Sequence, residues 1–330
     1  AGDNIVSSTD LYGGTVNLFK NTLGMQGIEV RFADPADPKN FEKLTDEKTR
    51  AYYGESCPNP YLRVFPIKEV ADIGRKHGIP LIIDNTASPV ICKPLEHGAA
   101  VVMHSLTKYI GGHGTSIGGI IVDGGNFDWT ANPKRQPLFN QEDPSYKGAV
   151  WGRDVPKLTG ANVAFAVRAR VVLLRDLGAP LSPFNAFQII QGLETVALRM
   201  KQHCVNAEKV VKFLETQKKV KNVIYPTNHQ GEIKDRAKRY MKGGYGSLVG
   251  MDVGTREAGS KFIDNLKMLY HVANIGDARS LAIHPATTTH SQLNDEELLA
   301  AGVTPGYVRL SIGIEHPDDI IGDIKQALAA

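Results

Sequence analysis

The stretch Ala99-Ala-Val-Val-Met-His-Ser-Leu-Thr-Lys-Tyr-Ile-Gly-Gly-His-Gly-Thr-Ser-Ile-Gly-Gly119 decides the fold of this chain. Its apolar first part, Ala99–Met103, predicts a buried strand, and Lys108 follows where that strand runs out into a glycine-rich loop. Upstream, the apolar run Ile79–Ile83 ends on Asp84 in the same way. In an open parallel sheet the carboxyl ends of such strands face one crevice, in which ligands bind. The sequence therefore predicts an α/β protein whose site lies at these strand ends.

Length and composition place the chain among ordinary globular proteins. Its 330 residues are too many for one small core and predict about two domains. Apolar residues make up 42% and charged residues 22%, as in typical globular domains. The 38 basic and 35 acidic residues are scattered along the chain and give a net charge of only +3. This balance gives no electrostatic basis for binding nucleic acid or an anionic membrane.

The cysteines, the apolar runs and the start of the chain bear on the cellular compartment and on the extent of the chain. Cys57, Cys92 and Cys204 are odd in number and lack metal-ligand spacing, which indicates a reduced, cytoplasmic protein. No apolar run approaches the ~20 residues of a membrane span, and no signal-like leader opens the chain. The chain opens on Ala1 without an initiator Met. We therefore expect it to be the middle and end of a longer polypeptide whose N-terminal part is missing here.

The first 125 residues alternate between strand-like and helix-like patterns. Helical spacing predicts a helix over Pro66–His77, and Asp37-Pro38 is typical of a helix start with proline at the first helical position. Alternation of this kind predicts βαβ units, with a mostly parallel mixed sheet between helices. The predicted strands are Ile5–Ser8, Glu29–Ala33, Arg50–Tyr53, Pro80–Asp84, Ala100–His104 and Gly119–Asp123.

The remainder predicts a long insert followed by a smaller α+β domain. Residues 124–157 show no periodicity and form a long connection. We predict a large domain over residues 1–199, which includes this insert, and a small C-terminal domain over residues 200–330. The later predicted elements are helices at Leu158–Leu177, Ser182–Thr216, Thr255–Leu266 and Asp318–Ala329, and strands at Ser247–Val253 and Tyr307–Ile312.

The residues around Lys108 indicate a particular chemistry. Ser105 and Thr107 flank this lysine, and the glycine loop after it offers unhindered amides of the kind that cradle a phosphate. A lysine in a partly desolvated pocket has a lowered pKa, which favours imine formation with a carbonyl. Asp84 is a carboxylate that can hold a pyridine nitrogen protonated. A lysine and a carboxylate of this kind are the pair that pyridoxal 5′-phosphate requires.

Three further residues are candidates at the same rim. Tyr12 follows the first strand and precedes two glycines, which suits a ring stacked on a cofactor. Asn59 follows the third strand and can donate to the cofactor's phenolic oxygen. Arg309 interrupts an apolar strand of the second domain and can grip a substrate carboxylate. The spacing of His113, His284 and His290 forms no metal cluster, so we predict no metal site.

Several motifs together resemble the Cys/Met-metabolism family of pyridoxal-phosphate enzymes, which has the fold-type-I architecture. The likeness runs from residue 2 to the end of the chain. Two regions, Val122–Tyr146 and Ala273–His290, resemble most closely the O-acetylhomoserine sulfhydrylase branch of that family. The motifs are Tyr12-Gly-Gly, Asn59-Pro, Asp84-Asn-Thr, Pro94-Leu-Glu-His-Gly98, Ser105-Leu-Thr-Lys-Tyr-Ile-Gly-Gly-His-Gly114 and Leu181-Ser-Pro-Phe-Asn-Ala-Phe187.

The resemblance implies a role for each candidate residue. Lys108 would be the Schiff-base lysine and the proton shuttle, and Asp84 would pair with the pyridine nitrogen. Tyr12 would stack on the ring and assist departure of the γ-substituent. The remaining roles are phosphate binding by Ser105 and Thr107, contact with the ring oxygen by Asn59, and substrate binding by Arg309, Asn274 and Asn59.

The resemblance also implies a reaction, which is γ-replacement on an O-acylated homoserine. Sulfide would give homocysteine, and a thiol such as methanethiol would give methionine. Within the family, γ-elimination as in methionine γ-lyase and condensation as in cystathionine γ-synthase remain alternatives. An alternative of another class is a cofactor-free, catalytically silent protein that serves in assembly.

Two departures from the family pattern accompany the resemblance. A Ser-Gly-Met-type turn for phosphate binding and a Tyr-x-Arg pair that reaches a neighbouring subunit would precede Ala1, and neither is present. The turn Ser56-Cys57-Pro58 stands where related sulfhydrylases have a smaller, glycine-containing turn. We expect a homotetramer of two tight dimers, with the aromatic-rich insert Gly124–Trp151 shaping the entrance to the site.

Overall fold

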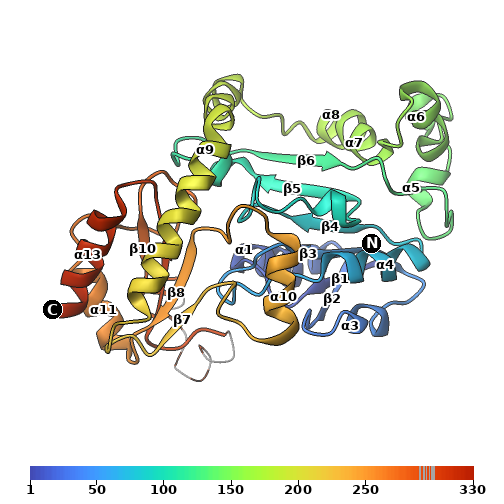
Figure 1. Cartoon of the computed structure of the whole chain (residues 1–330). Coiled ribbons are helices and arrows are strands. Elements are labelled where there is room, and N and C mark those ends of the chain that lie inside the picture. The colour runs from blue at the N-terminus through green and yellow to red at the C-terminus, as the bar shows by residue number, and fades with distance from the viewer. Residues whose placement is uncertain (290, 293, 295, 297, 299–301) are drawn as a thin grey trace.

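Two β-sheets organise the chain, as the computed structural model in Figure 1 shows. The structure describes residues 1–289, 291, 292, 294, 296, 298 and 302–330. Within these ranges, no helix is both long enough and apolar enough to cross a membrane.

The first sheet has six strands in the order β2-β1-β3-β4-β5-β6. All neighbouring strands pair in parallel except β5 and β6, which are antiparallel, so the expected mostly parallel sheet is confirmed. The chain leaves β1 toward β2 on one side and returns to β3 on the other, which makes the gap between β1 and β3 a switch point where ligands bind. The strands are β1 (Asn4–Ser8), β2 (Glu29–Ala33), β3 (Thr49–Glu55), β4 (Leu81–Asp84), β5 (Val101–Ser105) and β6 (Gly119–Asp123).

The helices of this part pack their apolar faces on the sheet. In α4 (Ile67–Lys76) the side chains of Ile67, Val70 and Ala71 are buried, because helical spacing places them on one face. They share a core with Val6 of β1 and Ile83 of β4. The other helical segments up to residue 110 are α1 (Gly13–Asn17), η1 (Leu18–Thr22), α2 (Leu23–Met25), α3 (Lys39–Lys43), η2 (Pro94–His97) and η3 (Leu106–Ile110).

The second sheet, ordered β7-β8-β11-β10-β9, is built from the C-terminal third of the chain. Its pairs are antiparallel apart from β10 and β9. Its strands are β7 (Asn222–Ile224), β8 (Leu248–Asp252), β9 (Tyr270–His271), β10 (Leu281–Ile283) and β11 (Tyr307–Ser311), and the helical segments around it are α10 (Gly231–Tyr240), α11 (Arg256–Asp264), η6 (Pro285–Thr287) and α13 (Pro317–Ala329).

One long helix, α9 (Pro183–Leu214), joins the two sheets (Figure 1). Its first half packs on the turn that follows β5, since Ile189 and Val196 share a cluster with Leu106 and Ile110. Its second half packs on the other sheet, where Val210 and its neighbours belong to the second core. The helix thus fixes how the carboxyl end of β5 faces the second sheet.

The insert over residues 124–157 lies at the amino ends of the first sheet, which corrects the prediction that it shapes the entrance to the site. Gln136 Nε2 donates to the carbonyl of Arg50 at 2.9 Å, and Asn126 Nδ2 donates to that of Ala99 at 3.0 Å. Both carbonyls lie at or before a strand start, whereas the predicted site is at the strand ends. Apolar side chains drive this packing: Ala100, Val101, Phe127, Trp129, Phe139, Trp151, Val155 and Ala164 form one buried cluster.

Secondary structure in and after the insert also differs from the prediction. The connection contains α5 (Pro137–Asn140), η4 (Pro144–Tyr146) and the start of α6 (Trp151–Thr159). The single helix predicted over Leu158–Leu177 is wrong, because α6 ends at Gly160 in a left-handed conformation with φ +71°. The chain then resumes as α7 (Ala164–Arg168), η5 (Ala169–Leu174) and α8 (Arg175–Leu177). Helix α3 begins at Lys39, so Pro38 caps the helix rather than opening it.

Candidate active site

The carboxyl ends of β3, β4 and β5 open onto a cavity of about 300 Å³, which the second sheet closes from the other side. Of the eight predicted site residues, seven line this cavity, and the eighth, Asn274, contacts two of them, Lys108 and Arg309. The structure therefore brings together residues from positions 12 to 309 of the chain. The seven are Tyr12, Asn59, Asp84, Ser105, Thr107, Lys108 and Arg309.

Lys108 lies in the helical turn η3 directly after β5. Its Nζ donates to Asn274 Oδ1 at 2.5 Å, across the gap between the two sheets. Burial, together with the nearby charge of Arg309, lowers the pKa of Lys108. A lowered pKa makes the neutral, nucleophilic amine more accessible, so the environment suits covalent chemistry at this nitrogen.

Asp84 is the last residue of β4 and points into the same cavity. The amide of Thr86 donates to Asp84 Oδ1 at 2.8 Å. Burial raises the pKa of Asp84, and the hydrogen bonds from Thr86 lower it. No cation contributes to that pKa among the described residues. A protonated ring nitrogen would supply the missing positive charge and hold this carboxylate ionised.

Two polar atoms of the cavity residues are buried and have no hydrogen-bond partner: Asn59 Oδ1 and Arg309 Nε. Arg309 is only 9% exposed, and its Nη2 donates to the carbonyl of Asn274 at 3.0 Å. Leaving such groups unpaired costs about 1–3 kcal/mol each. Unpaired buried atoms in a cavity indicate that a polar ligand completes the site, and with Asp84 and Lys108 they fit pyridoxal phosphate and its amino-acid substrate.

Ser105 and Thr107 lie on either side of the point where β5 becomes η3. The Ser105 amide donates to Thr86 Oγ1 at 2.7 Å, and Thr107 Oγ1 accepts from the Gly118 amide at 3.2 Å. These bonds fix the backbone that carries both hydroxyls at the cavity wall. The arrangement suits binding of a phosphate group by hydroxyls and amides.

Tyr12 directly precedes α1, after the carboxyl end of β1, and the residue is 60% exposed. Its backbone amide donates to Glu55 Oε1 at 2.7 Å. A Cβ at Gly14 would lie 2.4 Å from the Tyr12 ring, which explains why glycine follows the tyrosine so closely. The ring is thus held at the rim, on the cavity side of α1.

The residues that line the cavity but were not predicted as site residues include Glu55 and Cys57. Glu55 is the last residue of β3 and lies in register with Asp84 on the neighbouring strand. The predicted strand ended at Tyr53, two residues too early, so Glu55 fell outside the strand end. A polar residue at the carboxyl end of a strand in an open sheet is the signal that identifies it.

The histidines lie apart from this cavity. His284 is buried between Thr287 Oγ1 and the carbonyl of Pro305, and burial lowers its pKa. His113 is exposed, and His290 lies outside the described residues. Among the residues that the structure describes, no group of three or more His, Cys, Asp or Glu side chains is placed to hold a metal ion.

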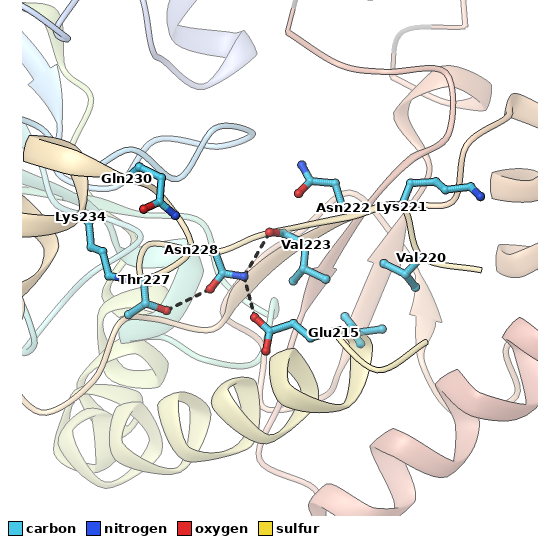
Figure 2. A pocket seen from close by; sticks show the side chains of 10 residues that line it. Glu215, Val220, Lys221, Asn222, Val223, Thr227, Asn228, Gln230 and Lys234 are labelled. Atoms are coloured by element: carbon cyan, nitrogen blue, oxygen red, sulfur yellow. Dashed lines mark hydrogen bonds between the residues drawn. The ribbon is translucent and has the colours of Figure 1, made fainter. Parts of the chain in front are cut away.

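A second hollow, of about 480 Å³, lies between the end of α9, β7 and α10 (Figure 2). Its polar groups bond to one another: Thr227 Oγ1 donates to Asn228 Oδ1, and Asn228 Nδ2 donates to Glu215 Oε1. None of the side chains that line it carries a buried, unpartnered polar atom. It holds none of the predicted site residues, so the strand-end cavity is the candidate active site.

Comparison with known proteins agrees with this geometry. An O-acetyl-L-homoserine sulfhydrylase from Leptospira meyeri is 50% identical over 99% of this chain and 75% of its own length. A homocysteine synthase from Schizosaccharomyces pombe is 46% identical over 99% of this chain and 76% of its own. In the solved structure of a Campylobacter jejuni putative O-acetylhomoserine (thiol)-lyase, a pyridoxyl-lysine is present. That structure matches with a TM-score of 0.91 and 40% identity, over 100% of this chain and 78% of its own.

A lysine and a carboxylate at the strand ends of a parallel sheet, facing an arginine on a second sheet, define a pyridoxal-phosphate-dependent enzyme. Residues 1–329 match the family described as Cys/Met metabolism PLP-dependent enzyme, and the chain belongs to that family. The predictions of family, fold class and cofactor are thereby confirmed.

Proposed function

We propose that the protein transfers the aminocarboxypropyl group of O-acetyl-L-homoserine to sulfide or a thiol. In this reaction the Cγ–O bond breaks and acetate leaves, while a C–S bond forms at the same carbon and gives homocysteine or a thioether. The names of the relatives at 42–50% identity support this substrate. The observation that carries the proposal is one cavity in which Lys108 and Asp84 face Arg309.

When bound, pyridoxal phosphate supplies an electron sink for the charge that develops on the substrate carbons. The roles that follow for this chain's residues are our proposal. Asp84 would keep the ring nitrogen protonated from the end of β4. Lys108, with its lowered pKa, would carry protons at the substrate's Cα and Cβ. Its place in the turn directly after β5 puts its amine in the same cavity as Asp84 and Arg309.

The other cavity residues bind and orient. Ser105 and Thr107 would hold the phosphate, and Asn59 the ring oxygen. Arg309, which has an unpaired buried Nε, would grip the substrate carboxylate. Asn274 would assist, since it already joins the amine of the lysine to the guanidinium of the arginine.

Tyr12 would stack on the ring and assist the leaving group. Its exposure at the cavity rim is consistent with that role, because a ligand bound there can cover the ring. Stacking of this kind orients the ring and adds apolar contact area.

We propose two domains, over residues 1–199 and 200–330, joined by α9. The change in the partners of this helix supports a boundary near residue 200. Val196 and Met200 pack with the turn after β5, whereas Ala207 and Val210 pack in the core of the second sheet. A continuous helix across the boundary would limit movement of one domain against the other.

We also propose a homotetramer, a dimer of dimers, in the cytoplasm. The edge strand β6, through residues on both of its faces, and one side of α9 expose apolar side chains, a pattern typical of large subunit interfaces. The three cysteines are free and buried, which suits a reducing compartment. The exposed residues are Ile120, Ile121 and Val122 of β6, and Phe184, Phe187, Ile190 and Leu193 of α9. A light-scattering mass of one chain at micromolar concentration would contradict the oligomer.

Product analysis tests the reaction. The purified protein, loaded with pyridoxal phosphate, is given O-acetylhomoserine, O-succinylhomoserine or methionine, each with and without sulfide. We expect homocysteine and acetate from O-acetylhomoserine, in a sulfide-dependent way. Release of a 2-oxo acid and ammonia from methionine, with no sulfide-dependent product, would indicate γ-elimination instead. Absence of the near-visible absorbance of a lysine-bound cofactor would contradict any catalytic role.

A further inference from the structure

We propose that Glu55 is a positioning residue that works in its protonated, uncharged form. It anchors the backbone of Tyr12 and leaves the negative charge at the cofactor ring to Asp84. This inference rests on the proposed cofactor site and deepens it. It divides two neighbouring carboxyl groups into one that must be charged and one that must not.

The geometry places the two carboxyls side by side. Glu55 ends β3 and Asp84 ends β4, and the two residues are partners in the parallel register. Neighbouring strands lie about 4.8 Å apart, and partners in a ladder point to the same face. Both side chains line the same cavity. Glu55 is nonetheless only 8% exposed, so little water screens the two groups from each other.

The hydrogen bond from the Tyr12 amide, at 2.7 Å, gives Glu55 a definite mechanical role. Tyr12 directly precedes α1, and its side chain makes no capping hydrogen bond to that helix. Gly13 and Gly14 follow at once, and glycine restrains the backbone least of all residues. A buried acceptor on the rigid end of β3 therefore fixes the peptide that carries the Tyr12 ring. Either a carboxylate or a neutral carboxyl can accept this bond through its carbonyl oxygen.

The charges around Glu55 decide which form it takes. Desolvation, with Asp84 and Asp10, raises the pKa of Glu55 well above its usual value, and the Tyr12 amide lowers it. The charge of Asp10 is already taken up by Arg63, which donates to both of its oxygens at 2.8 and 2.7 Å. The titratable groups that face Glu55 from the adjoining segments are Asp10, Tyr53, Cys57 and Asp84.

The site has two carboxyl groups, Glu55 and Asp84, and one positive charge to oppose them, that of a bound ring nitrogen, so one carboxyl is ionised and the other is not. The ring nitrogen of a bound cofactor can neutralise one carboxylate. Asp84 receives hydrogen bonds from both the amide and the side chain of Thr86, whereas Glu55 receives one, from the Tyr12 amide, so the charged form is the better stabilised at Asp84. Like charges in a poorly hydrated site cannot both ionise, so one group keeps a proton. That group is Glu55. If Glu55 ionised, its charge would raise the proton affinity of Asp84 and weaken the hold of Asp84 on the ring nitrogen.

Three variants of the holoenzyme test the proposal. E55A removes the acceptor of the Tyr12 amide, and we expect kcat to fall by about 10- to 100-fold with a smaller change in KM. E55Q keeps an uncharged acceptor of the same length, and we expect it to recover kcat to within about threefold of the wild type. E55D keeps the acid but shortens its reach, and we expect it to resemble E55A.

The protonation state has its own readout, independent of turnover. Difference infrared spectroscopy compares the wild type with E55Q at neutral pH. The wild type should show the carbonyl band of a protonated carboxyl, and E55Q should lack it. The matched control is D323N. Asp323 is a buried carboxylate far from the cavity that accepts from the amides of Lys267, Met268 and Leu269, and its pKa is lowered. D323N should destabilise the fold but keep the band.

The outcomes separate cleanly. An E55Q enzyme as slow as E55A, or a wild-type spectrum without the protonated band, would overturn the proposal. Wild-type kcat in E55A would overturn the positioning role. If E55A does not fold, a comparison of kcat between E55D and E55Q still tests the proposal. Because the infrared band needs no substrate, an enzyme that fails to use O-acetylhomoserine but keeps the band would refute the proposed reaction and leave the inference on Glu55 intact.

Discussion

The two ends of the first sheet differ in the side chains that surround them. At the amino ends, the insert over residues 124–157 packs Trp129 against Phe139 and Phe165, with ring centroids 4.3 and 5.5 Å apart. At the carboxyl ends, polar side chains surround a cavity, and Asn59 and Arg309 keep buried atoms without partners. The same six strands thus carry an apolar, filled end and a polar, hollow end.

This difference teaches where stability and chemistry are placed. Burial of aromatic surface at the amino ends contributes free energy that offsets the cost of unpaired buried polar atoms. Such atoms occur at both ends, Trp129 Nε1 and Arg135 Nε in the insert and Asn59 Oδ1 and Arg309 Nε at the cavity, but those at the cavity lie where a ligand can pair with them. Sites of catalysis are commonly strained or unsatisfied in this way, and the rest of the fold compensates. Substitutions at the cavity should therefore lower activity without lowering stability. Substitutions in the insert should lower stability without lowering activity.

The largest expected effect is that of Lys108→Ala. Without its amine, turnover should fall by about 10⁴-fold or more, and the absorbance of the lysine-bound cofactor should disappear. Lys157→Ala, on α6 of the insert, is the matched control and should change neither. An unaltered spectrum in Lys108→Ala would show that another group holds the cofactor.

Asp84→Asn should be next. The variant keeps the shape of the side chain but removes the charge opposite the ring nitrogen, so kcat should fall by about 10²–10³-fold while the cofactor stays bound. Asp143→Asn is the control at the opposite end. The carboxylate of Asp143 accepts from Trp151 Nε1 at 3.0 Å and from the Ser145 amide, and its loss should lower stability only. Equal kinetic losses in both variants would remove the distinction between the two ends.

Trp129→Ala should show the reverse signature. The side chain is 1% exposed within the aromatic cluster. Its truncation should lower the free energy of unfolding by about 3–5 kcal/mol. Denaturant unfolding measures this loss, and kcat per folded enzyme should stay within about twofold of the wild type. A large fall in kcat with unchanged stability would mean that the insert acts on the chemistry after all.

The cavity end was the more predictable of the two from sequence. Lys108 and Asp84 stand directly after apolar runs, and strand ends of a parallel sheet converge by topology alone, so local patterns were enough to bring them together. The strands Glu29–Ala33 and Gly119–Asp123 were predicted with their observed bounds.

The insert could not be predicted in this way. Phe127, Trp129 and Phe139 follow no helical or strand period, and they are buried only because distant residues such as Val101 meet them. Glu55 was not predicted as a site residue because the predicted strand ended two residues before the observed one. The strands β7, β9 and β10 have only two or three residues each, which is too short for a periodic signal.

The smallest expected effect is on thermal stability, and it comes from the Glu55 carboxyl in the cavity. The pKa of Glu55 is raised in the folded state, so folding favours its protonated form. The stability of the protein is then unaffected by this group below the unfolded pKa of about 4.3 and declines as pH rises from there toward the folded pKa. E55Q cannot ionise and escapes this decline. At a fixed concentration of protein and cofactor, its Tm should exceed that of the wild type by about 1–3 °C near pH 8. The gain should shrink toward about pH 5, where the unfolded carboxyl approaches its own pKa. Calorimetry across this range checks the sign, and a gain that grows toward acid pH would mean that Glu55 is charged in the folded protein.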